Sequence, residues 1–218
     1  MVVEGFDPRF PVGPNEQTFE QEGTILVAVV DRTYGDCGDE KDWGEMRERF
    51  RQDLEAKFKM RFEDGDVGPG ASLPAFLTLL EVGKEVPNWV WFAAAFFAGD
   101  PIQKNLEAWP KIAARLRPLL RIPAYLNRQG AAVVALQAIT DELGREPKSW
   151  RLCSYRIITA SDPEKLEDMP RSTTITDPAD TLYLGFMSHV FEIEADGSLF
   201  RVGVDGNESK TLQLGQRA

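Results

Sequence analysis

The sequence contains few of the side chains on which most catalytic and metal sites depend. His189 is the only histidine, and Cys37 and Cys153 are the only cysteines. A single histidine excludes sites that need several imidazole ligands, and it leaves one candidate base for a Ser-His or Cys-His pair. The two cysteines are far apart and follow no Cys-x-x-Cys spacing, so we expect both to be free thiols.

The surroundings of His189 favour a structural role. Strand alternation places His189, Phe191 and Ile193 on one face of a predicted strand. Because this face is apolar, we expect a hydrogen-bonded histidine in the core or at a sheet edge, and not a catalytic base.

The sequence also lacks the pattern of a secretory leader and a hydrophobic run long enough to cross a bilayer. Its first twenty residues are acidic and contain Pro8, Pro11 and Pro14, with no basic start followed by an apolar stretch. The uncharged segment Val86–Gly99 has 14 residues, whereas a membrane-spanning helix needs about 20 apolar residues. We therefore expect a cytoplasmic protein whose thiols stay reduced.

Positive charge is in short supply. The net charge is -10 and the sequence pI is about 4.8, which argues against nucleic acid as a partner. Charge is unevenly spread, because Lys104–Arg128 is mostly basic and Asp31–Asp66 is rich in carboxylates. The simplest interpretation is that these two regions face each other in the fold.

The order of patterns predicts an α+β fold. We divide the chain into an extended arm over 1–22, a strand plus a helical region over 23–146, and a β-rich region over 147–218, with the last two packed as one compact unit. Thr24–Val30 is a continuous apolar run, typical of a strand that is covered on both faces.

Five helices are predicted in the middle of the chain from apolar spacing, N-cap residues and glycine or proline stops. Residues 59–63 are open to two interpretations, because they can finish the first helix or form a strand. The predicted helices span residues 42–58, 72–82, 87–99, 100–120 and 128–143.

Beyond Pro147 the pattern changes to short runs of β-forming residues separated by turns such as Asp196-Gly197 and Gly206-Asn207. The last three runs are spaced as an antiparallel meander. The predicted strands span residues 150–159, 181–186, 189–194, 199–204 and 210–214.

Carboxylates near the first strand suggest a metal site. Asp31 ends this strand, and Asp36 and Asp39 follow in the next loop. If residues 59–63 form a parallel strand, a right-handed crossover brings Asp64 to the same edge of the sheet. Such a cluster of oxygen ligands suits Mg²⁺ and phosphoryl-transfer or hydrolytic chemistry. If these residues are helical, the cluster separates and the acids are ordinary solvated loop residues.

The segment over 86–99 is apolar around its whole helical circumference, which predicts a central, buried helix. If part of it is exposed, it becomes a candidate surface for a partner or a lipid interface. The residues concerned are Trp89, Trp91, Phe92, Phe96 and Phe97.

Taken as a whole, these patterns favour a non-enzymatic, cytoplasmic interaction or regulatory protein that uses an acidic and aromatic surface. Its expected partner is another protein, and this interpretation requires no cofactor. One alternative is a Mg²⁺-dependent hydrolase or phosphoryl-transfer enzyme that uses the loop carboxylates. The other is a membrane-associated effector that uses residues 86–99.

Overall fold

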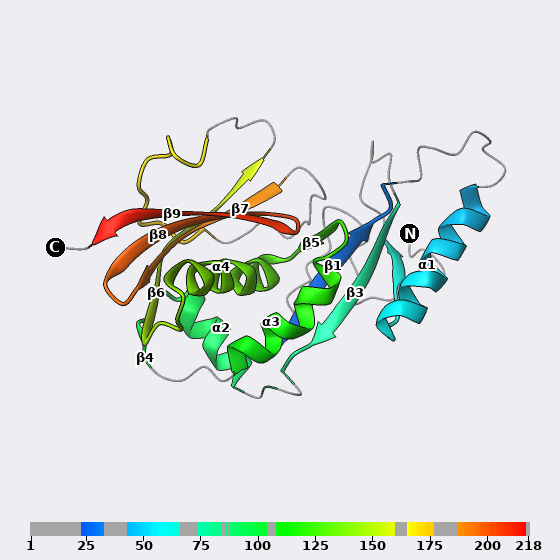
Figure 1. Cartoon of the computed structure of the whole chain (residues 1–218), viewed down its shortest axis with the longest axis horizontal. Coiled ribbons are helices and arrows are strands. Elements are labelled where there is room, and N and C mark those ends of the chain that lie inside the picture. Colours follow the sequence, from blue (N-terminus) through cyan, green and yellow to red (C-terminus); the bar gives the residue numbers. More distant parts are fainter. Residues whose placement is uncertain are drawn as a thin grey trace.

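The chain folds into four helices and two antiparallel sheets within the residues that the computed structural model describes. These residues are 23–32, 43–65, 74–83, 86, 88–103, 108–159, 165–176 and 187–216. The predicted α+β class is confirmed, and Figure 1 shows the two sheets side by side along the molecule, with α2, α3 and α4 between and below them and α1 beyond the first sheet.

The helices are α1 (Trp43–Phe58), α2 (Trp89–Phe97), α3 (Ala108–Leu119) and α4 (Arg128–Leu143). The strands of the first sheet, in spatial order, are β2 (Glu63–Gly65), β3 (Ala75–Glu81), β1 (Thr24–Val30) and β5 (Ala124–Leu126). Those of the second are β4 (Ile102–Gln103), β6 (Ser149–Thr159), β7 (Met187–Ala195), β8 (Ser198–Asp205) and β9 (Glu208–Gln216).

Strand β1 is the buried centre of the first sheet. All seven of its residues are buried, as the continuous apolar run predicts. Ile25, Val27 and Val29 belong to the main hydrophobic cluster, whereas Leu26 and Ala28 belong to a smaller one. Because successive side chains point to opposite faces, this division shows that both faces of the strand are covered.

The prediction of a helix over residues 72–82 is wrong, because Ala75–Glu81 forms strand β3. Phe76 contacts the main cluster and Leu77 the smaller one, so successive side chains are buried on opposite faces. A short apolar run fits either a buried strand or a buried helix by its pattern alone. Pairing with β1 along its whole length decides for the strand.

The ambiguity over residues 59–63 is resolved by the end of α1. The helix ends at Phe58, Lys59 takes a left-handed φ of 56°, and β2 begins at Glu63. β2 is an edge strand that pairs antiparallel with β3, so β3 lies between it and β1. The expected start of α1 at Asp42 lies outside the described residues.

The prediction of a helix beginning at Asp100-Pro101 is also wrong. Ile102–Gln103 forms strand β4, which pairs with β6, and the next helix begins at Ala108. Pro110 lies in the first turn of that helix and Pro118 in its last turn. Neither proline divides α3: Pro110 lies in the first turn, where its missing N–H has no partner within the helix, and Pro118 lies one residue before the helix ends.

Helix α4 matches its predicted bounds and contacts strands of both sheets. The Asn127 side chain accepts a hydrogen bond from the Gly130 N–H at 3.1 Å, and Gly144 ends the helix with a φ of 64°. A Cβ added at Gly130 would lie 2.8 Å from Cγ2 of Ile25. Glycine at position 130 therefore allows α4 to lie close against β1.

The second sheet contains the predicted meander over β7, β8 and β9. Asp196 and Gly197 form a two-residue turn with φ of 49° and 80°, the positive pair that a type I′ hairpin requires. The Asp196 carboxylate accepts hydrogen bonds from the N–H groups of Lys148 and Ser149 at 2.9 and 3.0 Å. This turn thus fixes the start of β6. The predicted strand over 181–186 lies outside the described residues.

One main hydrophobic cluster contains buried residues from the region before position 147 and from the β-rich region that begins there. It includes parts of α2, α3 and α4. Within the ranges that the structure describes, no helix is long and apolar enough to cross a membrane.

A buried ion pair holds residues 165–170 against the second sheet. The Arg201 side chain on β8 is 1% exposed and donates to the carboxylate of Glu192 on β7. It also donates to the backbone carbonyl groups of Leu166, Met169 and Pro170. These bonds use the donor capacity of the guanidinium, which compensates for removing its charge from water.

Replacing Arg201 should destabilise the fold strongly. Arg201→Leu leaves the Glu192 carboxylate buried without its counter-charge, and we expect the free energy of unfolding to fall by about 3–5 kcal/mol. Urea denaturation at pH 7.5 measures this change. The matched control is Arg145→Ala, which removes a more exposed pair with Asp196 and should cost less than about 1 kcal/mol. Equal losses in the two variants would contradict this account.

Candidate functional site

The predicted metal ligands are only partly brought together. Asp31 directly follows β1 and is 2% exposed, whereas Asp64 lies on β2 and accepts a hydrogen bond from Arg47 Nε at 3.1 Å. Both strands are antiparallel to β3, so their C-terminal ends reach the same end of the sheet with β3 between them.

Asp36 and Asp39 lie outside the described residues. Among the residues that are described, no group of three or more His, Cys, Asp or Glu side chains could hold a metal ion. The Mg²⁺ site therefore stays a prediction that depends on residues 33–42.

Helix α2 has two different faces, contrary to the expectation that its whole circumference is buried. Trp89 is 1% exposed and Phe96 1% exposed, but Trp91 is 79% exposed. Ala94 and Ala98, which follow Trp91 at helical spacing, are exposed as well. Because the sequence is apolar on every side, it could not indicate which face meets water.

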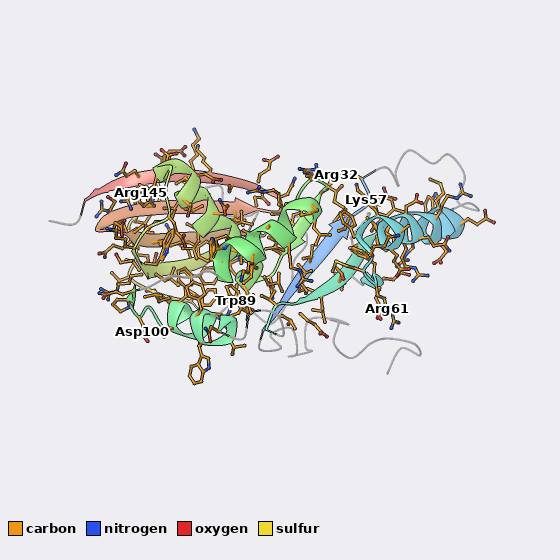
Figure 2. The ribbon with its side chains drawn as sticks, turned by 60° about the horizontal axis from the view of Figure 1, so that its bottom comes forward. Arg32, Lys57, Arg61, Trp89, Asp100 and Arg145 are labelled. Atoms are coloured by element: carbon orange, nitrogen blue, oxygen red, sulfur yellow. The ribbon has the colours of Figure 1, made fainter. Side chains whose placement is uncertain are left out.

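The inner face of α2 begins a continuous series of aromatic contacts. The rings of Trp89 and Phe92 lie 5.5 Å apart, and Trp109 on α3 lies 6.2 Å from Trp89 and 6.0 Å from Phe92. Figure 2 shows Trp89 on the side of α2 that faces α3, with Asp100 beyond the other end of the helix. Tilted and offset rings at these distances are the favourable arrangement for aromatic side chains.

The series continues along α2 into the second sheet. The ring of Phe97 meets Tyr155 edge-on at 5.9 Å and carries the Arg128 guanidinium 4.7 Å from its centroid. Tyr155 then contacts His189 and Phe191, at 6.0 and 4.9 Å. We call this series the aromatic chain; its members are Trp109, Trp89, Phe92, Phe96, Phe97, Tyr155 and His189.

His189 ends the aromatic chain and joins the two sheets. Its Nε2 lies 3.1 Å from the backbone oxygen of Leu126 on β5, and its Nδ1 lies 2.8 Å from the Tyr155 hydroxyl. A carbonyl oxygen can only accept, so Nε2 carries the proton and Nδ1 accepts from Tyr155. Burial lowers the pKa of His189 from 6.5 to about 4, outweighing the opposing effect of the bond to Leu126.

This geometry confirms the expectation of a hydrogen-bonded core histidine. Both ring nitrogens of the neutral imidazole are already bonded, so neither is free to take a proton from a substrate. Cys153 is the described cysteine, and its thiol is in no disulfide. Ile157 is the residue of β6 that lies opposite His189, which places Cys153 four positions further along that strand. At about 3.3 Å per residue this separation is too long for a Cys-His pair.

Of the five predicted interaction residues, Trp91 is the one that the solvent reaches fully. Trp89, Phe92 and Phe96 are buried and Phe97 is half-buried. Trp43 on α1, at 37%, is the other exposed large hydrophobic residue among those described. No charged residue lies within α2, so its outer face presents an indole ring among alanine methyl groups.

No family model, no curated protein and no solved structure matches this chain.

The stability of the protein should depend on pH through His189. The pKa of this residue is lower in the folded state than in the unfolded chain, so the unfolded chain binds the proton more readily. The stabilisation is complete above about pH 6.5 and is lost as the pH falls towards 4, by about 1.4 kcal/mol for each pH unit.

Urea denaturation at pH 7.5 and 5.5 measures this effect above the range in which most carboxylates titrate. We expect the free energy of unfolding to drop by about 1.4 kcal/mol more in the wild type than in His189→Gln. An equal drop in both proteins would contradict the assignment. In NMR spectra, the single histidine should stay neutral with its proton on Nε2 at pH 5.5.

Proposed function

We propose that this chain is a non-enzymatic protein of the cytoplasm that acts by binding another protein, and that Trp91 is its anchor side chain. The observation that carries the proposal is the 79% exposure of Trp91 on a helix whose opposite face belongs to the main core. Leaving an indole in water forgoes the gain of burying it, about 1.5–3 kcal/mol for a large apolar side chain. Binding a partner recovers that gain.

The surroundings of Trp91 suit a protein partner. Tryptophan is the residue type most often found as an interface hot spot, because it supplies a large rigid area and one N–H donor. Its helix is held from behind by Trp89 and Phe96, both 1% exposed, so the indole projects from a preorganised support. Less conformational entropy is then lost when a partner binds.

The charge of the chain indicates the chemistry of that partner. The net charge of -10 attracts a partner with a positive surface and accelerates their encounter at low salt. Two further features support the proposal over an enzyme: His189 has both nitrogens bonded, and the Cys153 thiol lies far along β6 from it. A cysteine that is in no disulfide also suits the reducing cytoplasm.

Replacing Trp91 should weaken partner binding without changing the fold. Trp91→Ala removes a hot-spot side chain, and we expect a loss of about 2–4 kcal/mol, or roughly 30- to 1000-fold in Kd. Tagged wild-type protein captures candidate partners, and calorimetry with each purified candidate then measures its affinity. Because Trp91 is exposed, the free energy of unfolding should change by less than about 0.5 kcal/mol.

The matched control is Trp43→Ala, which removes the other exposed tryptophan from a different helix. A partner that binds the wild type and Trp43→Ala alike, but loses affinity for Trp91→Ala, supports the proposal. If every captured protein binds Trp91→Ala as tightly as the wild type, the proposal is wrong. Flotation with phosphatidylglycerol vesicles tests the membrane alternative, and flotation that depends on Trp91 would favour a lipid surface instead.

A further inference from the structure

A second, separate feature lies between helices α3 and α4. The two helices contact each other and leave a cavity of about 250 Å³ between them. Its walls are apolar and include Leu116 and Leu120 on the α3 side and Val134 and Ala138 on α4. Arg117, Arg121 and Asp141 also line it.

The spacing of the lining residues explains why the space is hollow. Positions 113, 116, 117 and 120 form one stripe, and 134, 137, 138 and 141 form the facing stripe, each at intervals of three and four. Ala113 and Ala138 contribute only methyl groups where the stripes meet. Longer side chains at these positions would fill the space.

The charges at the cavity are unbalanced. Arg117 lies in the last turn of α3 and Arg121 two residues beyond its end; both are exposed, and neither side chain has a hydrogen bond or ion pair with any residue in the described ranges. Asp141, the one acid of the lining, accepts a hydrogen bond from Gln137 Nε2 at 2.7 Å. Two like charges that line the same cavity repel each other, and an anion between them offsets that repulsion.

We propose that this cavity binds a small amphipathic carboxylate, with its acid group on Arg117 and Arg121 and its hydrocarbon chain between the helices. The volume equals that of about eight water molecules in the liquid, which suits a hydrocarbon chain of roughly seven or eight carbons. An apolar wall with a few polar groups is the usual composition of such sites. This site is independent of Trp91 and goes beyond the binding of a protein partner.

Octanoate is the probe that tests the proposal. Calorimetric titration of the full chain with octanoate should show saturable binding at one site, and NMR shifts should concentrate on α3 and α4. Octan-1-ol has the chain without the charge, and acetate has the charge without the chain, so both should bind at least about 10-fold more weakly.

Three variants connect the binding to this cavity. The double substitution Arg117→Gln and Arg121→Gln removes both guanidinium groups from exposed positions and should weaken octanoate binding about 10- to 100-fold. Lys111→Gln removes a positive charge from the same helix outside the cavity and should leave the affinity within about 2-fold. Ala138→Leu fills the cavity and should abolish binding while the protein keeps its thermal transition.

Several results would overturn the proposal. They are an absence of saturation by about 10 mM octanoate, equal binding of acetate or octan-1-ol, and a loss in Lys111→Gln as large as in the double variant. Unchanged affinity in a folded Ala138→Leu would also overturn it, because octanoate would then bind at another place on the protein.

Discussion

The packing of the aromatic chain is the interaction on which the rest of the structure depends. It starts at Trp109 on α3, follows the inner face of α2, and ends at His189, whose Nε2 donates to Leu126 in the other sheet. Each aromatic ring buries a large area, and each ring contact adds about 0.5–1.5 kcal/mol beyond that burial. The aromatic chain thus connects two helices and both sheets around the main hydrophobic cluster.

This constraint also explains the surface of α2. A nine-residue helix with Trp89, Phe92 and Phe96 directed inward must turn Trp91 outward, because the helical period places it on another face. The same helix therefore supports the core and exposes an apolar group. Between α3 and α4, alanines line the contact and leave a cavity that two arginines also line. Close packing of the inner face of α2 leaves Trp91 exposed, and incomplete packing between α3 and α4 leaves the cavity. These are the two candidate binding features.

The sequence predicted the elements whose signals are local and unambiguous. Asn127 and Gly144 mark the two ends of α4, and the Asp196-Gly197 turn marks the hairpin between β7 and β8. The sequence failed at Phe76–Leu80, where an apolar run of this length fits a helix or a strand and only pairing with β1 decides. It also failed at Asp100-Pro101, where a helix-start signal precedes β4.

Of the candidate site, the sequence identified α2 but could not separate Trp91 from Trp89, since burial depends on what packs against each face. Similarly, nothing in the sequence paired Arg201 with Glu192, or placed Arg117 at a cavity.

Hydrogen exchange of the tryptophan indole N–H groups tests the two-faced α2 most directly. The five resonances can be assigned with Trp→Phe variants, and the sequence contains five tryptophans. The account predicts that the Trp91 signal exchanges within the dead time of the experiment. The signals of Trp89 and Trp109 should exchange far more slowly, because both indole nitrogens are buried and water reaches them only when the structure opens. A protected Trp91, or a Trp89 that exchanges as fast as Trp91, would contradict the central claim.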